Sequence, residues 1–179
     1  MAAVIKTHRL ILRAWRDDDG AVFARMHSDV EVMADLGGPI DQTSSIAKLD
    51  RYRAAYLEHG IARWAVEDRG GNFLGYAGVM PRPSPDHPLG PHHEIGWRFV
   101  RSAWGCGYAT ESARAALRDA FAKGLNEVVS YTSEDNFRSQ AVMVRLSLQR
   151  DQGRDFVADY GSNRWRGLVW VAQAQNWTG

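Results

Sequence analysis

The feature that most constrains the fold is a short glycine-containing loop between an apolar strand and the clearest helix of the chain. Residues 93–100 are typical of a strand, and the loop Trp104-Gly-Cys-Gly-Tyr-Ala-Thr-Glu111 follows at once. The helix carries one apolar stripe, formed by Ala109, Ala113, Ala116, Leu117, Ala120 and Phe121. An amphipathic helix that directly follows a strand needs a surface to cover, so the pattern predicts a sheet with helices packed against it.

Apolar periodicity predicts further elements on both sides of this unit. The expected strands are residues 9–15, 62–67, 73–80, 93–100, 127–132, 148–157 and 165–173. The expected helices are residues 17–28, 30–36, 43–59, 109–121 and 136–146. Residues 68–72 form a hairpin turn, and residues 81–91, which hold five prolines, form a loop. This order predicts an α+β fold with a mixed sheet and helices on both faces.

Length and composition limit the classes of protein. The 179 residues suit one domain over residues 1–179, and 45% hydrophobic with 24% charged residues is typical of a globular chain. The net charge is +1, which argues against nucleic acid as a partner. One cysteine, Cys106, excludes an internal disulfide, and no apolar run is long enough for a membrane helix or a signal peptide. We therefore expect a soluble, cytoplasmic protein with no membrane partner; a homodimer is compatible with the sequence.

The glycine-containing loop is the first candidate site. Gly105 and Gly107 allow tight turns and close approach of a ligand to the backbone. The amides of residues 106–110 then lie at a helix N-terminus, which favours an anion such as phosphate. The motif is neither a Walker loop nor a complete Rossmann fingerprint. A plain strand-to-helix turn and a thiolate nucleophile at Cys106 are the alternatives for these residues.

The second candidate site is the segment Asn136-Phe-Arg-Ser-Gln-Ala-Val-Met143, one strand later. Asn136 begins a helix directly after a strand, so it is either an N-cap or a ligand-binding residue. Together with the glycine loop, this segment resembles the acetyl-coenzyme A site of the GCN5-related N-acetyltransferases. More narrowly, it resembles the branch that includes the ribosomal-protein N-terminal acetyltransferases. The resemblance spans five ordered blocks: residues 7–15, 28–33, the strands 64–67, 74–78 and 94–97, then 104–111 and 136–146.

The resemblance implies a fold, a reaction and a set of coenzyme-binding residues. The fold would be a twisted, mostly antiparallel sheet flanked by helices. The reaction would move an acetyl group from acetyl-CoA to a primary amine of a protein N-terminus or a small molecule, directly in a ternary complex and without a metal. The expected acetyl-CoA-binding residues are Phe99, Val100, Trp104, Gly105, Cys106, Gly107, Tyr108, Ala109, Thr110, Asn136, Ser139 and Arg145.

Candidate catalytic groups follow from the implied reaction. The attacking amine must be neutral, and Glu94 is the candidate base; the alternative is an ordinary strand carboxylate that faces solvent. The backbone N–H of Phe99 is a candidate to stabilise the negative charge that develops on the thioester oxygen. Ser139 is a candidate to contact or protonate the coenzyme sulfur. The candidate acceptor-pocket residues, each of which alternatively belongs to the core, are Trp15, Met33, Leu36, Trp64, Tyr76 and His93.

The chain departs from the family pattern at three places. Arg101 stands where most members have proline, which affects the stiffness of the loop. Leu146-Ser-Leu148 replaces Leu-Gly-Phe or Leu-Gly-Met, so the turn after the helix must form without glycine. Met143 stands where many relatives outside this branch place the tyrosine that protonates the leaving thiolate, so another group or water must supply that proton.

Two rival functions remain on the same residues. The first is a catalytically silent domain that binds or senses coenzyme A, consistent with the missing tyrosine. The second is an interaction module that uses residues 105–110 for the phosphate of another nucleotide.

Overall fold

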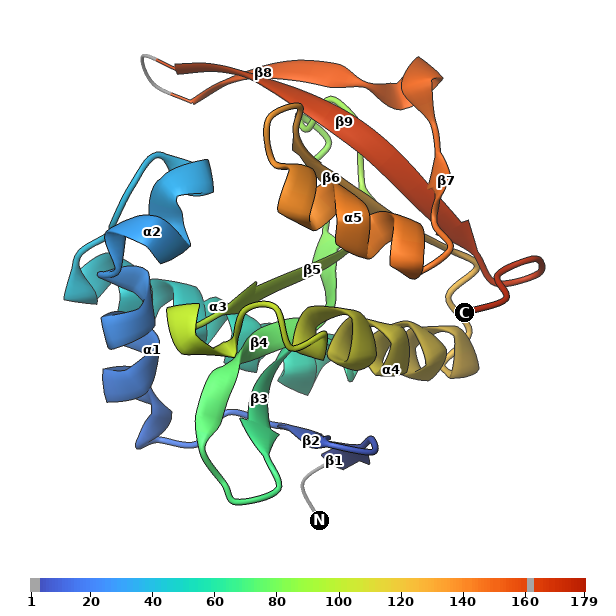
Figure 1. Ribbon diagram of the computed structural model, residues 1–179. Coiled ribbons are helices and arrows are strands. Elements are labelled where there is room, and N and C mark those ends of the chain that lie inside the picture. Colours follow the sequence, from blue (N-terminus) through green and yellow to red (C-terminus); the bar gives the residue numbers. More distant parts are fainter. Residues whose placement is uncertain (1–3, 161–162) are drawn as a thin grey trace.

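The computed structural model describes residues 4–160 and 163–179, which form a sheet with helices on both faces (Figure 1). The strands are β1 (Val4–Lys6), β2 (Leu10–Arg13), β3 (Arg63–Asp68), β4 (Phe73–Arg82), β5 (His92–Phe99), β6 (Glu127–Ser133), β7 (Gln149–Arg150), β8 (Phe156–Tyr160) and β9 (Asn163–Gln173). The α-helices are α1 (Asp19–His27), α2 (Val30–Met33), α3 (Gln42–His59), α4 (Tyr108–Ala122) and α5 (Phe137–Arg145). Three short 3-10 turns are η1 (Ala34–Leu36), η2 (Arg101–Ala103) and η3 (Gln152–Arg154).

The sheet has the order β1-β2-β3-β4-β5-β6-β9-β7, and β8 pairs with β9. Every neighbouring pair is antiparallel except β5 and β6, which run parallel. The parallel pair is connected through α4, which follows β5 and precedes β6. This arrangement confirms the expected mixed, mostly antiparallel sheet with helices on both faces.

Alternation along β4 explains how the sheet buries two cores. Ala77 and Val79 pack in a cluster with the α4 residues Ala113 and Leu117. Tyr76 and Met80, the intervening side chains, pack in a second cluster with the α1 and α3 residues Phe23, Leu49 and Tyr52. The apolar stripe expected on α4 is therefore the surface that covers one face of the sheet, and α1 with α3 cover the other.

The largest departure from the expected elements lies after α5. The single strand expected over residues 148–157 is wrong, because the chain forms β7, the turn η3 and then β8. Both strands pair with β9, so the break lets the chain move from one part of that long strand to another. Two smaller differences are that β1 had no expected counterpart and that β4 extends to Arg82, into the expected loop.

The turn after α5 forms with serine in a conformation that usually selects glycine. Ser147 has φ of 60°, and it is the one non-glycine residue with positive φ in the described ranges. Its N–H donates to Val144 O (2.9 Å), and Leu148 N–H donates to Met143 O (3.1 Å). These bonds complete a Schellman cap, which confirms that the chain makes this turn without glycine.

Candidate functional site

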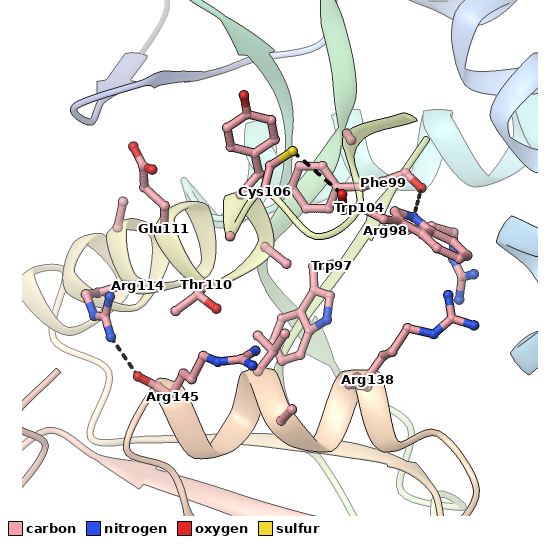
Figure 2. Close-up of a pocket in the computed structure, with 18 of the residues that line it drawn as sticks. Trp97, Arg98, Phe99, Trp104, Cys106, Thr110, Glu111, Arg114, Arg138 and Arg145 are labelled. Atoms are coloured by element: carbon pink, nitrogen blue, oxygen red, sulfur yellow. Dashed lines mark hydrogen bonds between the residues drawn. The ribbon is translucent and has the colours of Figure 1, made fainter. Parts of the chain in front are cut away.

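A large cavity of about 1930 Å³ lies where β5 ends and α4 begins (Figure 2). Its walls come from the β1–β2 segment, from α2 and η1, from β5, and from the facing sides of α4 and α5. Of the residues expected to bind acetyl-CoA, Val100 alone is not part of the lining. The cavity therefore brings together segments that are far apart in the sequence.

The sheet opens beside this cavity. In the described residues β5 and β6 share a single register pair, Glu94 with Val129, and the Ser130 hydroxyl donates to Ile95 O (3.0 Å); the two strands do not pair further toward Phe99. Val100 N–H donates to Leu74 O (2.9 Å), which places the backbone groups of Val100 on the β4 side. Backbone groups alternate sides along a strand, so the N–H groups of Trp97 and Phe99 face the open edge and the cavity.

The loop before α4 forms a cradle of backbone amides. Gly105 and Gly107 have φ of 77° and 79°, a conformation that side chains disfavour, and Gly107 is the N-cap of α4. The first backbone bond of α4 runs from Glu111 N–H to Gly107 O (3.1 Å), so the preceding amides are not used by the helix. An N-terminus of this kind can bind a phosphate group.

Arg9 braces the loop from the other side, a role that the sequence did not indicate. Its guanidinium donates to Cys106 O (2.9 Å), pairs with Glu111 (2.7 Å) and lies over the Tyr108 ring (4.8 Å). Thr7 also donates to Glu111 (2.6 Å). These contacts fix the loop and the first turn of α4, and they neutralise the charge of Arg9.

Trp104 holds the end of β5. Its indole Nε1–H donates to Phe99 O at 2.9 Å. The guanidinium groups of Arg101 and Arg138 lie over its ring at 4.7 and 4.3 Å. Since Arg138 belongs to α5, Trp104 connects the loop, the strand and the second helix of the cavity.

Asn136 caps α5 and also reaches across the cavity. Its Oδ1 accepts a hydrogen bond from Ser139 N–H (3.1 Å), which is the N-cap geometry. Its Nδ2 donates to Asp35 (3.2 Å), which is held in turn by Arg98 at 2.8 and 3.0 Å. Asn136 therefore joins α5 to η1 at the wall of the cavity, and Ser139 lines the same wall.

Glu94 lies outside the cavity lining and is buried, so the alternative of a solvent-facing carboxylate is wrong. Arg63 binds one carboxylate oxygen (2.9 Å) and Arg82 binds the other (2.5 Å). Burial alone would raise the pKa of Glu94, but the two guanidinium groups outweigh it and hold the pKa below its ordinary value. Glu94 is therefore ionised and fully paired, and its part in proton transfer stays a prediction.

The residues expected to form the acceptor pocket are not brought to the cavity. Four of them are core side chains or pack against the core: Trp15, Met33, Trp64 and Tyr76. Leu36 is exposed on η1, and His93 lies at a separate cleft of about 410 Å³ near the start of β6. Their aromatic and apolar character reflects core packing, which was the alternative for each buried one.

Beyond the open edge of β5, the cavity is lined by Val32, Ala34, Asp35 and Arg98. The Arg98–Asp35 pair is the polar part of this wall. No local pattern in the sequence indicates this pair, because the two partners lie on β5 and η1 and meet through tertiary packing alone. Met143, by contrast, is 1% exposed in the core and does not line the cavity.

Neither a metal centre nor a membrane span is present in the part of the chain that the structure describes. Across residues 4–160 and 163–179, no group of three or more His, Cys, Asp or Glu side chains is placed to hold a metal ion. Within the same ranges, no helix combines the length and the apolar character that a bilayer crossing requires.

Comparison with known proteins identifies the family. The model of the acetyltransferase (GNAT) domain matches residues 9–149. Uncharacterized protein YkkB of Bacillus subtilis (strain 168) is 34% identical over 117 residues, which cover 64% of this chain and 66%, just under two thirds, of YkkB. An acetyltransferase from Agrobacterium tumefaciens superposes with a TM-score of 0.79 at 25% identity, covering 96% of this chain and 94% of its own. RimJ from Mycobacterium smegmatis, in complex with CoA-disulfide, superposes with a TM-score of 0.70 at 18% identity, covering 99% of this chain and 89% of the RimJ chain. This chain belongs to the GNAT acetyltransferase family.

Proposed function

We propose that this protein transfers an acetyl group from acetyl-CoA directly to a primary amine that is bound at the same time. The observation that carries the proposal is one cavity that connects two surfaces. It runs from the amides of residues 105–110, past Trp97 and Phe99 at the open edge of β5, to Arg98 and Asp35 beyond that edge. A donor and an acceptor can meet at the edge from opposite sides, so no covalent enzyme intermediate is required.

The residues of the cavity fit acetyl-CoA. The free amides before Glu111 suit the pyrophosphate group, since they combine unpaired N–H donors with the positive end of the α4 dipole. The facing sides of α4 and α5 would enclose the pantetheine arm, with Ser139 and Val142 on one wall. The open N–H groups of Trp97 and Phe99 can bind that arm as a neighbouring strand would.

Residues of this chain have distinct roles in the proposed reaction. Acetyl-CoA supplies an acetyl group activated as a thioester. The N–H of Phe99 faces the open edge and is placed to stabilise negative charge on the thioester oxygen. The amine nitrogen bonds to the thioester carbon, the C–S bond breaks, and the coenzyme A thiolate leaves and takes a proton from water. Ser139 contacts the coenzyme near its sulfur. Glu94 accepts the amine proton through water, because it lies outside the cavity lining.

The acceptor is a primary amine of a protein N-terminus or of a small molecule, and the protein acts in the cytoplasm. We place the chain in the branch of the ribosomal-protein N-terminal acetyltransferases on the strength of its own motifs, above all Trp104-Gly-Cys-Gly-Tyr-Ala-Thr-Glu111. On the acceptor side Arg98 and Asp35 form an ion pair, so these two residues together add little net charge to the wall.

The test is a screen for acetyl-CoA consumption across small amines and short peptides with free N-termini. The control is a matched glycine pair at the two ends of α4. Gly107→Val places a β-branched residue at φ of 79° inside the cradle, whereas Gly124→Val makes the same change at φ of 93° outside the cavity. Each should cost about 1–3 kcal/mol in backbone strain. Only Gly107→Val should abolish acetyl-CoA binding in calorimetry.

The outcomes separate the proposal from its rivals. Turnover of at least one amine, lost in Gly107→Val and kept in Gly124→Val, supports transfer. Coenzyme A binding with no turnover across the panel favours the silent domain. Tighter binding of ATP or NAD than of coenzyme A favours the nucleotide module and overturns the assignment.

A further inference from the structure

The arginines of the cavity fall into two groups by their partners. Arg9 is neutralised by Glu111 and Arg98 by Asp35, at 2.7 and 2.8 Å. Four others also line the cavity, namely Arg114, Arg118, Arg138 and Arg145. Across residues 4–160 and 163–179, none of these four forms an ion pair with an Asp or Glu side chain, and Arg118 donates to Gly179 O at 3.0 Å. Lys6 and the carboxylates of Glu31, Asp119 and Asp135 also line the cavity, so the cations of the lining outnumber its carboxylates by two.

Helical spacing places the arginines that have no carboxylate partner in two parts of the cavity. Arg138 and Arg145 are seven residues apart on α5, so they share a face and are separated by about 10 Å along the axis. Arg138 stacks on Trp104, next to the amide cradle. Arg145 lies at the other end of α5, beside Arg114 of α4 (Figure 2).

Arg114 and Arg145 form a second cationic place. Arg114 lies six residues after the first residue of α4, about 9 Å along the helix from the cradle, and shares a face with Thr110. Its Nη2 donates to the backbone oxygen of Arg145 (2.6 Å), which connects α4 to α5. This bond does not use the other N–H groups of the Arg114 guanidinium. In Figure 2 the side chain of Arg145 extends into the space between the helices.

We propose that Arg114 and Arg145 bind the phosphate on the ribose of coenzyme A, and so select coenzyme A over its dephospho form. This inference rests on the proposed function. Coenzyme A carries a pyrophosphate and a separate phosphomonoester, and the cavity carries the amides before α4 together with Arg114 and Arg145 further along its wall. A phosphomonoester has a charge of about −1.5 to −2 at pH 7, and guanidinium is the side-chain group best suited to it.

The experiment compares calorimetric Kd values for coenzyme A and dephospho-coenzyme A, which differ in that one phosphate. The wild-type protein should bind coenzyme A about 10- to 100-fold more tightly, since charge-assisted hydrogen bonds are involved. Arg114→Gln and Arg145→Gln should each reduce this ratio about tenfold or more, and Arg145→Lys should restore part of it. Arg51→Gln, which removes the same charge from exposed α3, should leave the ratio unchanged. Arg138→Gln should weaken both ligands equally.

Failure of the inference differs from failure of the proposed function. If both ligands bind and their Kd values agree within about twofold, the phosphomonoester is not selected and the inference is wrong, while coenzyme binding stands. The inference is also wrong if the folded Gln variants at positions 114 and 145 keep the wild-type ratio. If neither ligand binds the folded wild-type protein, the proposed function fails and the inference falls with it.

Discussion

Replacing Glu94 with glutamine tests the most deeply buried charge cluster near the site. The change removes the negative charge that Arg63 and Arg82 share, although a glutamine oxygen can still accept one hydrogen bond. Arg63 is 4% exposed, so its cation cannot turn to water, whereas Arg82 at 38% can. Breaking a buried pair typically costs about 3–5 kcal/mol, and the partial escape of Arg82 places the expected loss near about 3 kcal/mol.

Urea unfolding at pH 7 measures this loss, and a double-mutant cycle assigns it. Arg63→Met alone should also destabilise, because it leaves Glu94 with one partner. The double variant should cost at least about 1 kcal/mol less than the sum of the two, since no buried charge is then unpaired on that side. A loss below about 1 kcal/mol in Glu94→Gln, with an unchanged slope in urea, would refute the reasoning.

Acid should reduce the difference between the two proteins. The folded-state pKa of Glu94 lies below its ordinary value, so the carboxylate stabilises the fold fully above the ordinary carboxyl range. That contribution is lost as the pH falls through the folded-state pKa. The advantage of the wild type over Glu94→Gln should therefore be constant near pH 7 and decline in acid.

Turnover of the same variant tests the proposed proton transfer. A positioned base contributes about 100- to 10,000-fold in rate. The assay must use a temperature at which the variant is folded and must include acetyl-CoA affinity, because stability and binding otherwise enter the result. If the folded variant acetylates a matched amine within about twofold of the wild type, solvent takes the proton and Glu94 only pairs the arginines.

Three further predictions concern single residues. Asn136→Ala should lower the free energy of unfolding by about 1 kcal/mol because it removes a helix cap, and Asp41→Ala should do the same at the start of α3. Only Asn136→Ala should also weaken acetyl-CoA binding or turnover, and equal affinity in both variants would leave Asn136 as a cap. Ser147→Gly should raise the free energy of unfolding by about 1 kcal/mol, because φ of 60° strains serine; a decrease in urea unfolding would contradict this. Burial lowers the pKa of His27 to about 4, so the unfolded chain binds more protons than the folded chain between that value and about 6.5. Moving from pH 7 to pH 5 should therefore lower the free energy of unfolding by about 2 kcal/mol more in the wild type than in His27→Gln, and parallel pH curves would contradict this.

Local sequence patterns predicted many of the residues that line the cavity. Gly105 and Gly107 mark backbone positions with positive φ, and the stripe on α4 marks the face that covers the sheet. Both signals depend on residues close together in the chain, so they can be read without the fold. Asn136 was also recognisable, because an asparagine after a strand and before a helix favours a cap.

Contacts between distant residues could not be predicted in the same way. Arg9 reaches Cys106 and Glu111 across about a hundred residues of sequence, and nothing in its neighbourhood distinguishes it from a surface arginine. The residues expected to form the acceptor pocket do not line the cavity, and the reason is different. Trp15 and Tyr76 are large, partly polar side chains, and such residues serve a core as readily as a pocket.

The alternation of side chains along β5 places neighbouring residues on two different walls of the cavity. Successive side chains point to opposite faces, so Trp97 and Phe99 belong to the α4 and α5 side while Arg98 belongs to the Asp35 side. Gly96 directly precedes Trp97, and a Cβ added there would come within 2.5 Å of the Arg63 guanidinium. A slip of one residue would therefore exchange the two faces and also drive a side chain into Arg63. The register of β5 with β4 thus fixes which side chains of the strand face α4 and α5 and which face Asp35.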